Sequence, residues 1–184
     1  MPFDPISYAL AKNAMKYSKS IKPDWEVLAE VEVEADCDYV EFTGLDINSD
    51  KAYVIFMFVK NPTSSSCSYQ IFINGDTTST NYYKQYAKAS GTSIAGDRTN
   101  DSIMATINAG ATTVAVIYVM LDIDGYSRVI FIGNRQAPDS VEIIITNVAK
   151  NTTETNITSI RIAVDVAGGI GAGSKFILAR VKRP

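Results

Sequence analysis

Hydrophobic and polar residues alternate with a period of two along much of this 184-residue chain after residue 24. The run WEVLAEVEVE (25–34) places Trp25, Val27, Ala29, Val31 and Val33 at alternate positions, with glutamates at most of the positions between them. Successive side chains of a strand point to opposite faces of a sheet. The run is therefore predicted to be a half-buried strand with one acidic face.

Further short apolar runs predict strands, and polar turn residues separate them. These strands are expected at Tyr39–Thr43, Ala52–Lys60, Ser68–Asn74, Tyr82–Ala89, Ile103–Asn108, Thr113–Asp122, Ser127–Gly133, Val141–Val148, Ile157–Val166 and Lys175–Val181. Asp124-Gly125, between two of them, predicts a hairpin. Many short strands with little helix between them predict an all-β fold, an antiparallel sandwich or barrel, for which a two-sheet jelly roll is the best single choice.

A different period marks the N-terminus, where residues 4–19 predict a single helix. Asp4 is a suitable N-cap, and Ile6, Leu10 and Tyr17 share one face. The helix has few large apolar residues, so we expect it to pack on something. The chain is accordingly divided into a helical docking segment, 1–22, and a β-sandwich domain, 24–184.

The composition is that of one soluble globular domain, with 46% hydrophobic and 20% charged residues. Its formal net charge of −3 argues against a general nucleic-acid-binding protein, which would carry an excess of bases. The N-terminus lacks the pattern of a secretory signal, and no apolar run is long enough to span a membrane. Synthesis in a cytoplasm and no membrane partner are expected.

Charge is unevenly distributed between the first two segments. Residues 1–22 contain four lysines and one aspartate, whereas residues 24–50 contain ten acids and no base. Such segregation favours docking between copies, with a basic helix against an acidic strand. The candidate docking residues are Lys12, Lys16, Lys19, Glu30, Glu32 and Glu34. The alternative is that both segments are simply solvated surfaces.

No motif in the chain indicates catalysis. The chain has no histidine, the most frequent general base, and no nucleophile motif of the hydrolase or β-lactamase type. A pair of carboxylates brought together only by the fold remains open. We expect a protein that is not an enzyme, with no catalytic residues.

Two short segments resemble ligand-binding loops without satisfying their patterns. DINSDK begins like a calcium loop, but Lys51 stands where glycine is required and Met57 where glutamate is required. The glycine-rich run 168–175 ends in Gly-Ser-Lys and precedes a strand, whereas a phosphate loop ends in Gly-Lys-Ser/Thr and precedes a helix. An Asx turn and a glycine turn are predicted instead, with no metal and no cofactor.

Tyr82, Tyr83 and Tyr86 lie among Lys84, Gln85 and Lys88, a mixture of aromatic and basic residues that could bind sugar or a single nucleic-acid strand. In a strand, Tyr82 and Tyr86 point one way and Tyr83 the other, so part of this group is expected in the core. The two cysteines, Cys37 and Cys67, are expected to be free buried thiols, with a lone bridge as the alternative.

Several phrases resemble β-sandwich modules of structural proteins from tailed phages and related viruses. They are FTGLD, a strand opening at Tyr53, SYQIFINGD followed by TSTNYY, and later TNITSIRI and AGSKFIL. The resemblance spans roughly residues 40–181. It implies a small tail-, head-fibre- or capsid-associated virion protein, but it supplies no functional residue.

The expected function is therefore that of a virion structural protein, acting through self-assembly and docking. Its expected partners are other copies of itself and other virion proteins, with no nucleic acid. The alternative is a carbohydrate- or receptor-binding module with the same fold, which would use the Tyr82–Tyr86 region to contact a surface glycan or receptor.

Overall fold

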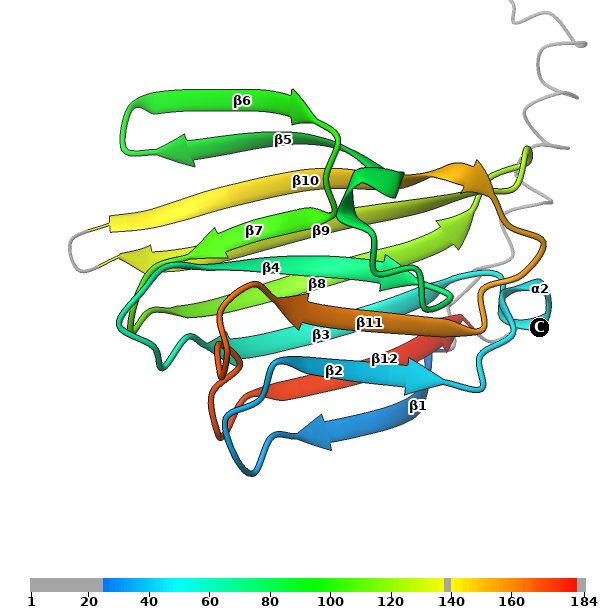
Figure 1. Ribbon diagram of the computed structural model, residues 1–184, viewed down its shortest axis with the longest axis horizontal. Coiled ribbons are helices and arrows are strands. Elements are labelled where there is room, and N and C mark those ends of the chain that lie inside the picture. Colours follow the sequence, from blue (N-terminus) through cyan, green and yellow to red (C-terminus); the bar gives the residue numbers. More distant parts are fainter. Residues whose placement is uncertain (1–24, 138–139, 182–184) are drawn as a thin grey trace, which may run out of the picture.

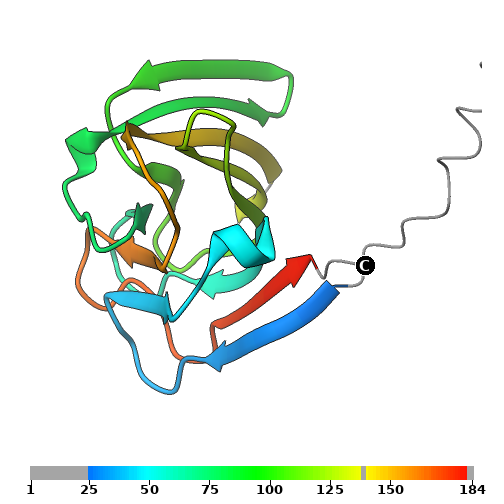
Figure 2. The same cartoon turned by 90° about the vertical axis from the view of Figure 1, so that its right-hand side faces the viewer.

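The computed structural model describes residues 25–137 and 140–181, which form two antiparallel β-sheets packed face to face. In Figure 1 the smaller sheet lies in front of the larger one, and Figure 2 shows the two layers from the side. The larger sheet has the spatial order β1 (Trp25–Glu32), β12 (Lys175–Val181), β3 (Tyr53–Lys60), β8 (Thr112–Leu121), β9 (Tyr126–Ala137), β10 (Ser140–Thr153), β5 (Tyr82–Ser90) and β6 (Ser93–Thr99). The smaller sheet has the order β2 (Tyr39–Thr43), β11 (Ser159–Val164), β4 (Cys67–Ile73) and β7 (Ile103–Ile107).

The chain passes repeatedly from one sheet to the other. β2, β4, β7 and β11 belong to the smaller sheet, and each is preceded and followed by a strand of the larger sheet. Two short helical turns, α2 (Ile47–Asp50) and η1 (Ser79–Asn81), lie in the connections. The predicted antiparallel two-sheet architecture is confirmed, whereas the predicted helix at residues 4–19 lies outside the described residues.

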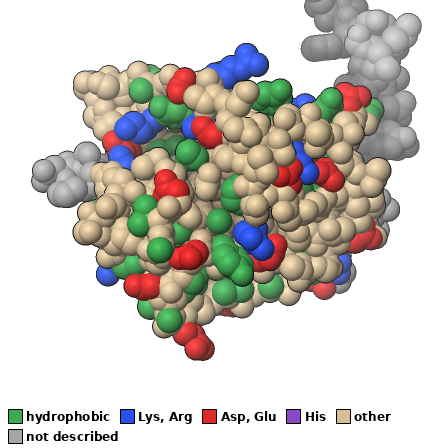
Figure 3. All heavy atoms as spheres, viewed as in Figure 1, with side chains coloured by type: hydrophobic (Ala, Val, Ile, Leu, Met, Phe, Trp, Pro, Cys, Tyr) green, Lys and Arg blue, Asp and Glu red, His purple; other side chains and the backbone are tan. Residues whose placement is uncertain are grey.

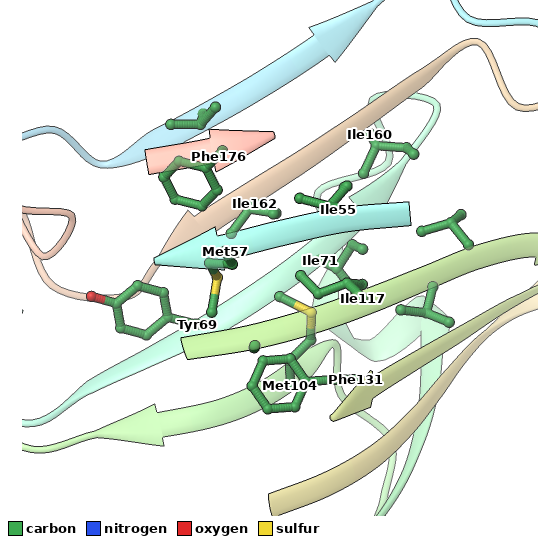
Figure 4. Packing of buried hydrophobic residues seen from close by; sticks show 14 of the residues in the cluster. Ile55, Met57, Tyr69, Ile71, Met104, Ile117, Phe131, Ile160, Ile162 and Phe176 are labelled. Atoms are coloured by element: carbon green, nitrogen blue, oxygen red, sulfur yellow. The ribbon is translucent and has the colours of Figure 1, made fainter. Parts of the chain in front are cut away.

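The core lies between the sheets, where alternate side chains of facing strands meet (Figure 4). Ile55, Ile117 and Phe131 project from the larger sheet, and Ile71 and Ile160 project from the smaller one. All five are fully buried. Every second residue of these strands is thus buried between the sheets, which explains why their inner-facing positions are apolar.

The hairpin predicted at Asp124-Gly125 is confirmed and joins β8 to β9. The Asp122 carboxylate accepts hydrogen bonds from the backbone N–H groups of Asp124 and Tyr126, at 3.0 and 2.9 Å. Gly125 has a φ of 86°, a conformation that side-chain-bearing residues rarely adopt. The turn chemistry thus sets the register of the two strands.

The uninterrupted alternation predicted for residues 25–34 is wrong. The pairing of β1 with β12 shifts register between Val27 and Ala29, because Leu28 forms a bulge. A bulge inserts one residue and reverses the faces that follow it. Val27 is consequently exposed, whereas Val33 is buried.

Both cysteines are free, as expected, but only Cys67 is fully buried. Its thiol donates to Oδ1 of Asn61 at 3.3 Å. Cys37 is partly exposed, and its backbone forms an isolated antiparallel β-bridge with the backbone of Ile170. Partial burial raises the pKa of the Cys37 thiol, and nearby Asp38 and Asp36 add to this effect.

Candidate functional site

The outer face of the larger sheet carries a row of apolar side chains across neighbouring strands. Phe56 on β3 pairs with Val116 on β8, Val116 with Ile132 on β9, and Ile132 with Ile145 on β10. The row continues to Ile177 on β12 at one end and Ala87 on β5 at the other. Cross-strand pairs of this kind lie about 5 Å apart, so the row is continuous.

A second row runs beside the first, with Phe58 opposite Val114 and Ile143 opposite Asn134. Phe56, Phe58, Val114, Ile132, Ile143 and Ile145 keep between 37% and 53% of their area exposed. A third row, on the other side of the first, includes Tyr118 on β8 and Ile130 on β9. Within the described residues, no outward position of these three rows on β3, β8, β9 or β10 carries a charged side chain. We call these outward positions the apolar sheet face; they are Val54, Phe56, Phe58, Val114, Val116, Tyr118, Ile130, Ile132, Asn134, Ile143, Ile145 and Asn147.

The outer face of the smaller sheet is different in character. Figure 3 views this side and shows mainly backbone and side chains that are neither hydrophobic nor charged, with scattered hydrophobic and charged side chains between them. Arg161 on β11 pairs with Glu41 on β2 at 2.9 Å and lies 4.3 Å from the ring centroid of Tyr39. A hydrated face of this kind is ordinary for an antiparallel sheet, whereas the apolar sheet face is not.

The structure places the predicted docking glutamates at the start of the described chain. Glu30 and Glu32 are exposed on β1, and Glu34 is exposed just after it. Glu32 pairs with Lys175 of the adjacent strand at 2.9 Å, which raises the pKa of Lys175. Their predicted counterparts Lys12, Lys16 and Lys19 lie outside the described residues.

The three tyrosines do not form one surface. Tyr82 is fully buried, and its hydroxyl accepts from the N–H of Ile73 at 2.9 Å. Tyr83 is exposed on the outer face of the larger sheet. Tyr86 points to the inner side and lines a pocket near the β7 edge of the smaller sheet.

This pocket has a volume of about 290 Å³, and Lys84, Tyr86, Lys88, Asp97 and Arg135 contribute to its lining. It forms because β5 and β6 extend the larger sheet past β7, the last strand of the smaller sheet. The ammonium of Lys84 lies 5.3 Å from the Tyr86 ring centroid. An aromatic ring beside polar groups in a concave site is suited to a polar ligand such as a sugar.

Most of the charges around the pocket are paired with one another; among the described residues, Asp97 is the lining charge without an ion pair. Lys84 lies 3.0 Å from Asp101, and Lys88 lies 3.4 Å from Glu142. Arg135 also pairs with Glu142, and both are buried. Apart from Asp97, the lining charges are compensated, which favours a neutral polar ligand over an ion.

Glu142 shows how this network acts on a carboxyl group. Burial would raise its pKa, but a hydrogen bond from Ser90, the charge and hydrogen bond of Arg135 and the charge of Lys88 together lower it below its ordinary value. The Arg135 guanidinium also donates to the carbonyl oxygen of Thr106 and to Oδ1 of Asn108, each at 2.9 Å. The network joins the two sheets at the pocket.

The run that resembles a calcium loop forms the helical turn α2 instead. Asp46 caps it by accepting from the backbone N–H of Asn48 and the hydroxyl of Ser49, at 3.2 and 2.7 Å. Asp50 accepts from the hydroxyl of Tyr53 at 2.7 Å and pairs with Arg180 at 2.6 Å. Both carboxylates are thus used within the fold, consistent with the Asx-turn interpretation.

The glycine-rich run 168–175 is a turn that packs against neighbouring backbone. Gly168 and Gly173 have φ values of 69° and 82°. A Cβ on Gly169 would lie 2.9 Å from the sulfur of Cys67, so a side chain does not fit there. The predicted interpretation as a turn that permits close approach is confirmed.

Across residues 25–137 and 140–181, no group of three or more His, Cys, Asp or Glu residues is arranged to hold a metal ion. In the same part of the chain, no helix is long and apolar enough to cross a membrane.

The sequence interpretation missed the apolar sheet face, although a signal was present. The runs YVIFMFV, VAVIYVM, RVIFI and EIIIT are apolar at nearly every position. In an antiparallel sheet with one hydrated face, alternation is expected instead. Continuous apolar runs therefore indicate that both faces avoid water.

The chain matches no model of a protein family, no curated protein and no solved structure.

Proposed function

We propose that this protein is a structural building block that acts by shape and by contact with other copies, without catalysis. The apolar sheet face carries the proposal. Soluble monomers seldom leave an apolar surface of this extent uncovered, because association removes it from water. The outer face of the smaller sheet, on the opposite side of the molecule, is polar. The molecule therefore has one apolar face suited to association and one face suited to solvent.

The chain path supports a jelly roll as the finer description of the fold. The passage β2, β3, β4, β5 alternates between the sheets, β5 and β6 pair within the larger sheet, and β6, β7, β8 and β11 alternate again, as in two interlocked Greek keys. The hairpin β9–β10 is then an insertion between β8 and β5, and β1 and β12 extend one edge. Jelly rolls are frequent in viral capsid proteins.

The virion is the proposed location. It rests on the resemblance of the phrases FTGLD, SYQIFINGD and TNITSIRI to structural modules of tailed phages and related viruses. In this setting, residues 1–22 act as a second docking element, and their net charge of +3 complements the acidic residues on and near β1.

The proposal is tested by purifying particles from the source of this chain and identifying their proteins by peptide mass spectrometry, followed by electron microscopy. A structural protein is expected in stoichiometric, repeated copies at defined positions. Its absence from purified particles contradicts the virion assignment. A strictly monomeric full chain contradicts the structural role as a whole.

A second candidate function is carbohydrate or receptor binding at the pocket beside Tyr86. The favouring observation is the aromatic ring of Tyr86 next to charges that are mostly paired with one another. Glycan-array binding by the full chain that is lost in Tyr86→Ala, but kept in Tyr83→Ala on the outer face, supports this function. Equal binding by both variants contradicts the placement at this pocket.

A further inference from the structure

We propose that the apolar sheet face is an isologous interface, on which two copies of this chain pack their larger sheets against each other. The inference rests on the proposed structural function and specifies the surface through which copies meet. Two stacked sheets pack about 10 Å apart with interdigitated side chains, and the twist keeps their strands within about 30° of each other.

The exposed area is large enough for such a contact. A fully exposed large apolar side chain presents on the order of 150–200 Å², so the exposed fractions of Phe56, Phe58, Val114, Ile132, Ile143 and Ile145 amount to on the order of 450 Å². A standard interface buries about 800 Å² per partner, a little over half of it apolar. The face therefore supplies the apolar share of a stable dimer contact.

The distribution of these residues is symmetric about the middle of the sheet. The boundary between β8 and β9 divides the eight strands equally. Val116 and Ile132 flank this boundary, and Phe56 and Ile145 lie one strand further out on either side. A two-fold axis along the strands at this boundary would place Phe56 of one copy over Ile145 of the other.

The charged residues at the two sheet edges favour the same orientation. Glu30 and Glu32 lie on β1 at one edge, where Lys175 of the adjacent β12 pairs with Glu32 and leaves Glu30 in excess, and Arg98 lies on β6 at the other edge. An axis across the strands would bring the acidic edges of both copies together. An axis along the strands separates these edges and turns each toward the edge that carries Arg98, which is the electrostatically preferred choice.

Other occupants fit the face less well. Nucleic acid or an acidic peptide requires cations, and none lies among the outward positions of the apolar sheet face. The helix predicted at residues 4–19 offers three large apolar residues on one face, namely Ile6, Leu10 and Tyr17. A second copy presents an apolar surface equal in extent to the one it covers.

The test compares the full chain with Ile145→Lys by sedimentation velocity over a concentration series. Ile145 points away from the core, so the variant is expected to fold, which circular dichroism and thermal unfolding verify. Two buried, unpaired ammonium groups per dimer are expected to raise the dissociation constant at least about 100-fold. The matched control is Thr43→Lys, at an exposed position on β2 of the smaller sheet. This variant is expected to change the dissociation constant less than about two-fold.

A milder variant keeps the test decisive if the lysine impairs folding. Ile145→Thr preserves β-branching and is expected to weaken association about ten-fold. Association that is the same in both Ile145 variants as in the unchanged chain overturns the interface but leaves the proposed structural function standing. A monomeric full chain overturns both, and association that emerges only after deletion of residues 1–22 shows that this segment covers the face instead.

Discussion

Ile132 on β9 and Ile145 on β10 lie opposite each other on the outer face of the larger sheet, and each keeps over two-fifths of its area exposed. Their immediate neighbours in sequence, Phe131 and Ile144, point inward and are buried. These strands are therefore apolar on both sides. The inner side builds the core, and the outer side gives the molecule a surface that is more stable when covered.

Gly133 is expected to be required by the packing of Phe131. A Cβ at Gly133 would lie 2.6 Å from Cζ of Phe131 and 3.0 Å from the Cβ of Ala115. Gly133→Ala is therefore expected to lower the free energy of unfolding by about 1–3 kcal/mol, measured by urea denaturation. In a Phe131→Leu background, which removes the far end of the ring, Gly133→Ala is expected to lower the free energy of unfolding by a smaller amount. Equal costs in the two backgrounds contradict the proposed clash.

The buried pair of Arg135 and Glu142 is expected to stabilise the fold at the pocket. Glu142→Gln removes the carboxylate charge and is expected to lower the free energy of unfolding by about 2–4 kcal/mol near pH 7. The control is Glu30→Gln on exposed β1, with an expected change below about 0.5 kcal/mol. A Glu142→Gln variant as stable as the unchanged protein would show that the ion pair is dispensable.

The same pair gives stability a defined dependence on pH. The pKa of Glu142 is lower in the folded state than its ordinary value of 4.5, so the unfolded chain binds its proton more readily. The contribution of Glu142 is then complete above about pH 4.5 and is lost as pH falls through the lower folded pKa. The stability difference between the unchanged protein and Glu142→Gln should shrink in acid, as measured by urea denaturation from pH 7 to pH 3. A constant difference would contradict this assignment.

Calcium is expected to leave the protein unchanged. The carboxylates of Asp46 and Asp50 are engaged by Ser49, Tyr53 and Arg180. Binding an ion at this turn would require breaking these contacts, and a calcium loop needs several further oxygen ligands. Equal melting temperatures in millimolar calcium and in chelator are expected. A rise of several degrees with calcium would overturn this interpretation of α2.

Deleting residues 1–22 is expected to leave the sandwich folded while weakening association. The segment carries a net charge of +3 beside an acidic stretch of ten carboxylates, so its contribution should decrease as salt screens these charges. Sedimentation velocity at low and high salt measures both effects. Unchanged assembly of the truncated protein, or outright unfolding, would exclude a docking role for the segment.

The sequence predicted most strands because their inner positions alternate and their turns have distinctive residues. Tyr39–Thr43 and Lys175–Val181 were predicted with the bounds that the structure gives. The hairpin at Asp124-Gly125 was equally predictable, because glycine accommodates its positive φ.

β6 (Ser93–Thr99) was missed, because its sequence SIAGDRT has little apolar content and its residues are mostly exposed. It becomes a strand by pairing with β5, a tertiary effect that local sequence does not record. The bulge at Leu28 was missed for a related reason, since register depends on the partner strand. The apolar sheet face required knowledge of which strands are neighbours, because its rows join residues from β3, β8, β9 and β10.

The central claim, that this protein functions through self-association, is tested most directly by sedimentation equilibrium of the full chain at micromolar concentrations. The monomer has a mass of 20.0 kDa. The account predicts a concentration-dependent mass that reaches at least twice this value in physiological salt. A mass that stays at the monomer value over the whole concentration range would contradict it.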